Sequence, residues 1–204
     1  MMGPMMNGER RKAFFLDRDG VILKVRYLEP YPPETPDDRI VPKLVTIDQV
    51  MILPGVAGAL KRIRDRGYLA VVVTNQGYIE RGVITREGMD AIHDHINDLL
   101  AREGAHIDAF YICPHTRGTI CECRKPGTLL FRQAAEEWNI DLAESFMVGD
   151  RKSDIAAGRA AGCRESFLVR RGGWGERTLA ALKGEVDFPV CDDLADVVAR
   201  TLPE

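Results

Sequence analysis

Two aspartates separated by one residue, Asp17 and Asp19, stand at the end of an apolar run and directly before Gly20. On an extended segment the side chains of residues i and i+2 point to the same side, so the two carboxylates can converge. Two like charges at close range are costly unless a divalent cation or a shared proton offsets them. The pair therefore predicts a cation site or a proton-transfer site. The alternative is a polar turn at a strand end, because Asp and Gly are common turn residues.

Two further polar clusters could bind an oxyanion. Thr74, Asn75 and Gln76 come directly after an apolar run and precede a glycine. A hydroxyl and amides at such a point, together with freed backbone N–H groups, can donate hydrogen bonds to an oxyanion. Arg124 and Lys125 precede a proline and offer a clamp for a phosphate or sulfate. The alternatives are an ordinary loop for the first cluster and surface charge for the second.

Another carboxylate closes a third apolar run. Phe146 to Val148 leads into Gly149 and Asp150, and Asp154 follows four residues later. A carboxylate at the end of a buried strand is a candidate ligand for a hard cation, and Asp154 could support it from behind. The alternative is a helix cap followed by a charge in the first turn.

Three cysteines and one histidine crowd together between residues 113 and 123. Cys113, His115, Cys121 and Cys123 supply three thiols and one imidazole, whereas the other two cysteines stand alone. Such a set forms a closed tetrahedral zinc site with no position left for water. The alternative is a chance group of reduced cysteines. We therefore predict a structural zinc that pins a short loop and helps to fix the adjoining clamp of Arg124 and Lys125.

The elements that must position these groups alternate along the chain. Apolar runs typical of buried strands occur at 13–16, 69–73, 109–112, 146–148 and 166–169. Helical patterns occur at 56–63, from a Thr85 cap to about residue 102, and at 128–138, 153–161 and 194–202. This alternation predicts an α/β fold with a mainly parallel sheet and helices on both faces. Ligands in such folds bind at the carboxyl ends of the strands, which is where the clusters stand.

The composition is that of an ordinary globular protein. The chain has 204 residues, of which 45% are hydrophobic and 29% charged, and its formal net charge is −3. The length favours one domain over residues 13–204, with residues 1–12 as a disordered lead-in. Nothing in the charge predicts a nucleic-acid or membrane partner, and no apolar stretch is long enough to span a bilayer. Five cysteines without a disulfide pattern favour the cytoplasm.

Residues 26–50 interrupt the alternation of strands and helices. Five prolines fall between residues 29 and 42, which opposes regular structure. Because the proline-rich stretch begins ten residues after Asp19, one interpretation is a flap beside the site. The other is a floppy insertion.

The sequence also allows predictions for a few residues outside the clusters. His93 and His95 fall two apart on the helix after Thr85, and we expect both to face solvent. Trp174 lies among three glycines, which favours a simple turn over the alternative, a contact with substrate. Candidate substrate contacts outside the clusters are Tyr27, Tyr31 and Arg81.

Taken in order, the clusters resemble the haloacid dehalogenase (HAD) superfamily of phosphatases and phosphotransferases. The matching residues are Asp17-Arg18-Asp19-Gly20-Val21, Thr74, Lys125, and Gly149-Asp150 with Asp154, and they cover the chain from about 13 to 170. The resemblance implies a Rossmann-like three-layer α/β/α fold. No insertion is long enough to form a large cap domain, so the zinc loop and the segment 26–50 would shape the pocket.

The resemblance also implies roles for individual residues. Asp17 would be the nucleophile that forms an aspartyl-phosphate, and Asp19 the general acid and base. Mg²⁺ would be held by Asp17, the backbone carbonyl of Asp19 and Asp150, with Asp154 behind them. Thr74 and Lys125 would hold the phosphoryl oxygens. The remaining substrate- or phosphate-binding candidates are Asn75, Gln76 and Arg124.

The Cys/His loop narrows the resemblance to one branch of the superfamily, which contains heptose bisphosphate phosphatases and histidinol-phosphate phosphatases. The run Ile79-Glu80-Arg81-Gly82 follows Thr-Asn-Gln and resembles the heptose branch more closely. The resemblance therefore favours a heptose 1,7-bisphosphate as the substrate, from which the 7-phosphate would be removed. The short zinc loop keeps histidinol phosphate as the alternative substrate. An alternative of another class is an inactive phosphate-binding regulatory module, against which the complete set of Asp17, Asp19, Lys125 and Asp150 argues. The oligomeric state stays open.

Overall fold

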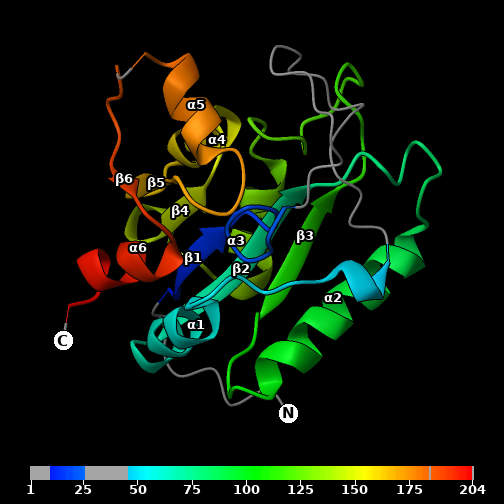
Figure 1. Ribbon diagram of the computed structural model, residues 1–204. Helices are drawn as coiled ribbons and strands as arrows, with labels where there is room; N and C mark the ends of the chain where they lie inside the picture. Colours follow the sequence, from blue (N-terminus) through cyan, green and yellow to red (C-terminus); the bar gives the residue numbers. More distant parts are fainter. Residues whose placement is uncertain (1–9, 26–45, 184, 204) are drawn as a thin grey trace.

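The computed structural model describes residues 10–25, 46–183 and 185–203 (Figure 1). Its centre is a six-stranded sheet in the order β3-β2-β1-β4-β5-β6, and every neighbouring pair is parallel. The strands are β1 (Lys12–Leu16), β2 (Tyr68–Asn75), β3 (Ala109–Cys113), β4 (Phe146–Gly149), β5 (Glu165–Val169) and β6 (Val190–Cys191). The helices are α1 (Val56–Asp65), α2 (Arg86–Ala101), α3 (Leu129–Trp138), α4 (Lys152–Ala161), α5 (Gly175–Ala181) and α6 (Leu194–Thr201), with 3-10 turns at Ile47–Gln49 and Leu142–Glu144.

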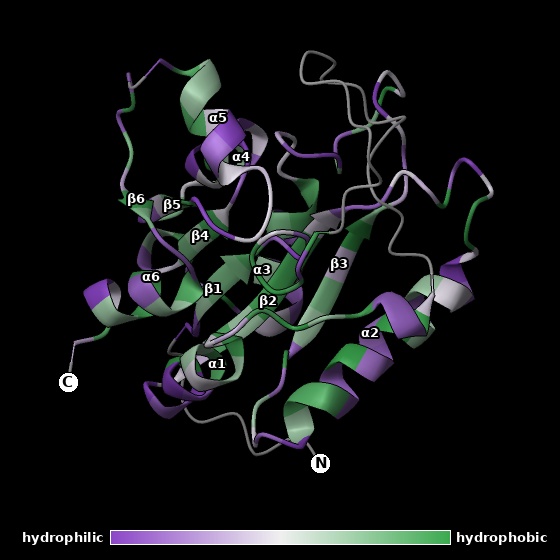
Figure 2. Cartoon of the chain, in the orientation of Figure 1, coloured by the Kyte–Doolittle hydropathy of each residue, from purple (hydrophilic) through white to green (hydrophobic). Residues whose placement is uncertain are grey.

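Helices cover both faces of the sheet, which gives the three layers that the alternation predicts. One apolar cluster joins the sheet to α1, α2 and α6, and a second joins the opposite face to α3 and α4. Figure 2 shows the same arrangement, because the strands are mainly apolar while α2 carries polar residues on its outer side. The sheet is therefore buried from both sides, as its continuous apolar runs indicate.

Strand β1 lies in the middle of the sheet, between β2 and β4. Phe14 and Leu16 pack into the cluster with α1, α2 and α6, whereas Ala13 and Phe15 pack into the cluster on the other face. All four side chains are fully buried. Because the chain order reverses between β1 and β4, the carboxyl ends of these two strands form the crevice where open α/β sheets bind ligands.

The structure confirms the five predicted strands and the five predicted helices, within two residues at most ends. The Thr85 cap is confirmed as well, since its side chain accepts a hydrogen bond from the Gly88 N–H at 3.0 Å. Among the described residues, one strand and one α-helix are additional to those predicted. Strand β6 has only two residues, and α5 begins directly after Trp174, where a simple turn was expected.

Some expectations fall on parts of the chain that are not described. Residues 26–45 of the segment 26–50, with all five of its prolines and with Tyr27 and Tyr31, lie outside the described residues. So do residues 1–9 of the expected lead-in. Lys12, by contrast, is the first residue of β1. Within the described ranges, no helix is both long and apolar enough to cross a membrane.

Candidate active site

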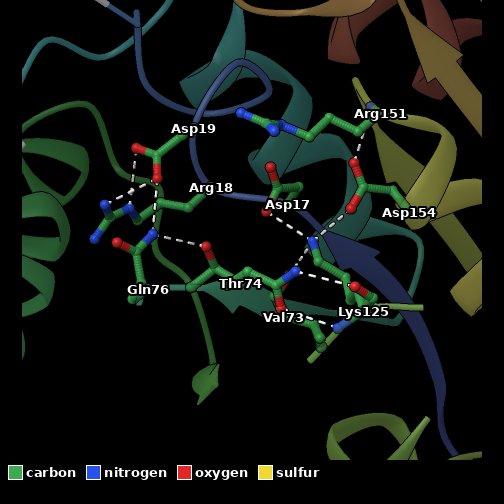
Figure 3. A network of polar contacts seen from close by, with 10 residues as sticks. Asp17, Arg18, Asp19, Val73, Thr74, Gln76, Lys125, Arg151 and Asp154 are labelled. Atoms are coloured by element: carbon green, nitrogen blue, oxygen red, sulfur yellow. Dashed lines mark hydrogen bonds and ion pairs between the residues drawn. The ribbon is translucent and has the colours of Figure 1, made fainter. Parts of the chain in front are cut away.

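The polar clusters meet at one edge of the sheet (Figure 3). Asp17 follows β1, and its N–H donates to the Val148 carbonyl of β4 at 2.9 Å. Thr74 and Asn75 are the last two residues of β2. Asp150 follows β4 directly. The parallel sheet thus brings residues more than a hundred positions apart to a single crevice.

Lys125 is the centre of this group. Its side chain is buried, and the ammonium lies 2.7 Å from Asp17 Oδ1, 2.7 Å from the Val73 carbonyl oxygen and 2.7 Å from Asp154 Oδ1. An ammonium has three protons, so this set uses all of them. The lysine therefore neutralises two carboxylates and ties the end of β2 to the segment before α3.

Asn75 holds the backbone of the same lysine. Its Oδ1 accepts from the Lys125 N–H at 3.0 Å, and its Nδ2 donates to the Lys125 carbonyl at 3.2 Å. Both ends of the amide are therefore engaged with Lys125. Asn75 positions the lysine in this structure, and its contact with a substrate stays a prediction.

Asp150 and Asp154 differ in how their oxygens are satisfied. Asp154 Oδ1 pairs with Lys125, and Oδ2 accepts from the Arg151 N–H at 2.9 Å. Asp150 Oδ2 accepts from the Trp174 N–H at 2.6 Å, but its Oδ1 is buried and has no hydrogen-bond donor in the part of the chain that the structure describes. A buried carboxylate oxygen that lacks a donor is expensive unless a cation faces it.

Among the described residues, burial and mutual repulsion raise the pKa values of two carboxyl groups in the crevice. Burial raises the pKa of Asp17 to about 6, against the lowering effect of Lys125, and repulsion from Asp154 adds to the rise. Burial likewise raises the pKa of Asp150 well above its usual range, with repulsion from Asp17 and Asp154 contributing. Burial alone would lower the pKa of Lys125, but Asp154 and Asp17 raise it, so the lysine stays charged. Lys125 thus pairs with Asp17 and Asp154, whereas Asp150 has no ion-pair partner among the described residues.

These three carboxyl groups fit a divalent cation. One oxygen from each of Asp17, Asp150 and Asp154 lies within 4.8 Å of the others. Hard cations take such oxygens as ligands. Since both Asp154 oxygens already have partners, the atom that most needs a cation is Asp150 Oδ1.

Asp19 lies apart from this group, with its side chain about one third exposed, at 35%. The Arg18 guanidinium donates to both of its carboxylate oxygens, at 3.2 and 2.9 Å, and Gln76 Nε2 donates to Oδ2 at 2.7 Å (Figure 3). Gln76 also donates to Thr74 Oγ1 at 2.9 Å. Burial alone would raise the pKa of Asp19, but the Arg18 charge and these hydrogen bonds hold it below its usual range.

Arg18, which stands between Asp17 and Asp19 in the sequence, is almost completely buried, and two residues of α2 contact its guanidinium. Its Nη1 lies 2.9 Å from Met89 Sδ and 3.3 Å from His93 Nε2. His93 itself is buried and stacks on Phe110 with ring centroids 4.1 Å apart. The expectation that His93 faces solvent is therefore wrong. Burial lowers the pKa of His93 to about 3, with the Arg18 charge adding to the effect, so the imidazole is neutral and its Nε2 can accept a hydrogen bond from Arg18.

The four candidate zinc ligands also come together, at the end of β3 and in the loop after it. Cys113 Sγ lies 3.3 Å from Cys123 Sγ and 3.9 Å from Cys121 Sγ, while His115 Nδ1 lies 3.2 Å from Cys123 Sγ. These separations exclude disulfides, whose sulfur atoms are about 2.05 Å apart. They are close to the edges of a tetrahedron with zinc–sulfur bonds of about 2.3 Å. All five cysteines are free thiols.

Hydrogen bonds join this Cys/His loop to the segment that contains Arg124 and to the segment that follows β2. Arg124 Nη1 donates to the His115 carbonyl at 2.9 Å. Glu80 accepts from the Thr116 N–H and hydroxyl, each at 2.6 Å, and from the Thr119 hydroxyl at 3.0 Å. The loop therefore supports the segment that contains Arg124 and the segment that follows β2.

Comparisons with known proteins give a consistent result. A family model described as HAD-hydrolase-like matches residues 122–197. The D-glycero-beta-D-manno-heptose-1,7-bisphosphate 7-phosphatase of Bordetella bronchiseptica is 34% identical over 193 residues, which is 95% of this chain and 99% of that protein. The protein of the same name from Rhodopseudomonas palustris is 36% identical over 160 residues, 75% of this chain and 81% of that one.

The fold is also similar to a solved structure of this group. The D,D-heptose 1,7-bisphosphate phosphatase of B. bronchiseptica, complexed with magnesium and phosphate, superposes with a TM-score of 0.78 at 34% identity, over 94% of this chain and 98% of that one. The chain is therefore a phosphatase of the HAD superfamily and belongs to the family of the D-glycero-D-manno-heptose-1,7-bisphosphate 7-phosphatases.

Proposed function

We propose that this phosphatase is Mg²⁺-dependent and removes the 7-phosphate of D-glycero-D-manno-heptose 1,7-bisphosphate through an aspartyl-phosphate on Asp17. The observation that carries the proposal is the buried set of Asp17, Lys125 and Asp150 at the switch point of the sheet. The names of the relatives support the substrate, since both are heptose bisphosphate phosphatases.

In the first half of the reaction, Asp17 attacks the phosphorus atom. Lys125 holds one of its carboxylate oxygens, so the nucleophile has a defined orientation. Thr74 lies at the end of the neighbouring strand and is placed to donate to a phosphoryl oxygen. When bound, Mg²⁺ supplies positive charge that offsets the repulsion between the anionic nucleophile and the anionic phosphate.

Asp19 acts as the proton donor to the leaving alkoxide and then as the base that activates water. The donors on Arg18 and Gln76 favour its ionised form, which is the form that the second half of the reaction requires. For the first half it must take up a proton. The negative charge of a bound phosphate ester favours that uptake, because a like charge raises a carboxyl pKa.

Mg²⁺ binding should strengthen as the pH rises. Burial raises the pKa of Asp17 to about 6, so below that pH a proton must leave before the carboxylate can ligate the ion. From Asp17 alone, we expect Mg²⁺ affinity at pH 5 to be about tenfold lower than at pH 7. Titration calorimetry in two buffers of different ionisation enthalpy measures both the affinity and the protons released. An affinity that does not change over this range would contradict the raised pKa.

We also propose that Cys113, His115, Cys121 and Cys123 hold one structural zinc ion. Four protein ligands leave no open position, which is typical of a structural site. Free thiols at all five cysteines support a reducing compartment such as the cytoplasm. We further propose that residues 13–204, together with Lys12 at the start of β1, form one domain, since both apolar clusters share the same sheet.

A phosphate-release assay with Mg²⁺ tests the substrate. The panel contains both anomers of heptose 1,7-bisphosphate, heptose 7-phosphate, a hexose bisphosphate, histidinol phosphate and p-nitrophenyl phosphate. We expect kcat/KM for one heptose 1,7-bisphosphate anomer to exceed that for histidinol phosphate by at least about 100-fold. A reversed order would assign the chain to histidinol phosphate. No release from any member would favour the inactive phosphate-binding module.

A further inference from the structure

One turn of the chain around the start of α5 contacts Asp150 at two points. The Trp174 N–H donates to the Asp150 carboxylate Oδ2 at 2.6 Å, and the Thr178 hydroxyl donates to the Asp150 backbone carbonyl at 2.9 Å. The two residues are themselves joined, because the Thr178 N–H donates to the Trp174 carbonyl at 2.8 Å. Both the backbone and the side chain of Asp150 are thus tied to the same helical turn.

Two glycines close the space around the same carboxylate. A Cβ atom at either Gly20 or Gly173 would overlap Asp150 Oδ2. At Gly175, a Cβ atom would overlap the Val169 carbonyl, so α5 lies against the end of β5 without a side chain between them. This close packing leaves the Asp150 carboxylate little freedom to rotate.

The two oxygens of the Asp150 carboxylate therefore differ: one accepts a hydrogen bond and the other is available to a cation. Oδ2 accepts from the Trp174 N–H, whereas Oδ1 is buried and has no donor among the described residues. The Asp150 carboxylate belongs to the group with Asp17 and Asp154. If Asp150 could turn, the N–H could pair with either oxygen and the geometry of the cation site would be lost. Fixing the backbone carbonyl of the residue restricts that movement.

We propose that Thr178 is a positioning residue for the Mg²⁺ site, which acts by anchoring Asp150 so that Oδ1 faces the ion. This inference rests on the proposed Mg²⁺ dependence. Partners that orient metal ligands in this way commonly contribute 10- to 100-fold to metal affinity. The Thr178 hydroxyl donates to the backbone of Asp150 and not to its carboxylate, so its loss should weaken Mg²⁺ binding more than it slows the chemistry.

The test is calorimetric titration of Mg²⁺ into the zinc-loaded, Mg²⁺-free protein. Thr178→Val removes the hydroxyl and keeps the shape, and we expect it to bind Mg²⁺ about tenfold more weakly. Thr178→Ser keeps the hydroxyl and should restore the affinity. In turnover assays, the Mg²⁺ concentration for half-maximal rate should rise about tenfold in Thr178→Val, with kcat at saturating Mg²⁺ within about twofold of wild type.

Thr201→Val is the matched control. The Thr201 hydroxyl also donates to a backbone carbonyl, that of Val197 at 2.8 Å, but within α6 and outside the crevice. This variant should bind Mg²⁺ like the wild type. Thr178→Ala provides a second loss of the hydroxyl should Thr178→Val fail to fold.

The outcomes separate the inference from the proposed function. Wild-type affinity in both Thr178→Val and Thr178→Ala, or an equal loss in Thr201→Val, would overturn the positioning role and leave the Mg²⁺ phosphatase intact. Failure of the wild-type protein itself to bind Mg²⁺ would overturn the proposed metal dependence, and the positioning role with it.

Discussion

Replacement of Asp17 by asparagine should lower phosphate release below about one hundredth of the wild-type rate. The amide has nearly the same shape, and its oxygen can still accept a hydrogen bond from Lys125, which lies 2.7 Å from Oδ1. It lacks the negative charge of the attacking group and of the proposed metal ligand. The initial rate of phosphate release from the preferred member of the substrate panel is the measurement.

Stability distinguishes a chemical loss from a structural one. Burial raises the folded-state pKa of Asp17 to about 6, above its ordinary value of 3.8, so above pH 6 the metal-free protein holds an ionised Asp17 at a cost in stability. Asp17→Asn should therefore unfold no more easily than the wild type at pH 7.5 without Mg²⁺. Asp187→Asn, at an exposed aspartate that pairs with Arg159, serves as the control and should retain full activity. Residual activity above about one hundredth would remove Asp17 from the nucleophilic role.

Replacement of Cys121 by serine should release the proposed zinc and destabilise the protein. Metal analysis of the purified wild type should find about one zinc ion per chain, and the variant should contain almost none. We expect the free energy of unfolding to fall by at least about 3 kcal/mol, or roughly 10 °C in Tm, because structural zinc contributes directly to folding. Activity should fall too, since the loop supports the segment that leads into Lys125.

Cys163→Ser is the matched control for the zinc prediction. Cys163 is half-buried and lies outside the cluster, so this variant should retain its zinc. Two results would contradict the proposal: native wild-type protein that is free of metal, with Cys113, Cys121 and Cys123 open to alkylation, or zinc loss in Cys163→Ser as large as in Cys121→Ser.

Local sequence patterns were sufficient to predict most of the fold. Strands buried on both faces leave continuous apolar runs, and the run that ends at Leu16 identified the central strand. Thr85 marked the start of α2 because its hydroxyl is the kind of group that caps a helix. Strand β6 and helix α5 were missed for a physical reason. Two residues carry no periodicity, and a seven-residue helix within a glycine-rich stretch has a pattern too short to recognise.

The sequence was sufficient to predict which residues meet at the site, but it predicted only part of the hydrogen bonds and ion pairs between them. The spacing of the clusters correctly implied that Asp17, Lys125 and Asp150 share one edge of the sheet. The spacing could not indicate that the Lys125 ammonium already donates all three of its protons to protein oxygens, or that Asn75 forms hydrogen bonds with the Lys125 backbone. Both sets of contacts depend on tertiary packing. Arg18 and His93 were missed for the same reason. A buried arginine or histidine carries no local signature when its partner lies on another element.

The burial of β1 has a consequence for the tolerance of this enzyme to change. Phe14 and Leu16 fill one face of the sheet while Ala13 and Phe15 fill the other, and all four are fully enclosed. A shift of the strand by one residue would send each side chain to the wrong face and, in one direction, place Phe14 in the buried position of Ala13. It would also turn the Asp17 carboxylate away from Lys125. A one-residue insertion or deletion in this strand therefore cannot yield a slightly slower enzyme, because the register that permits folding is the register that aims the nucleophile.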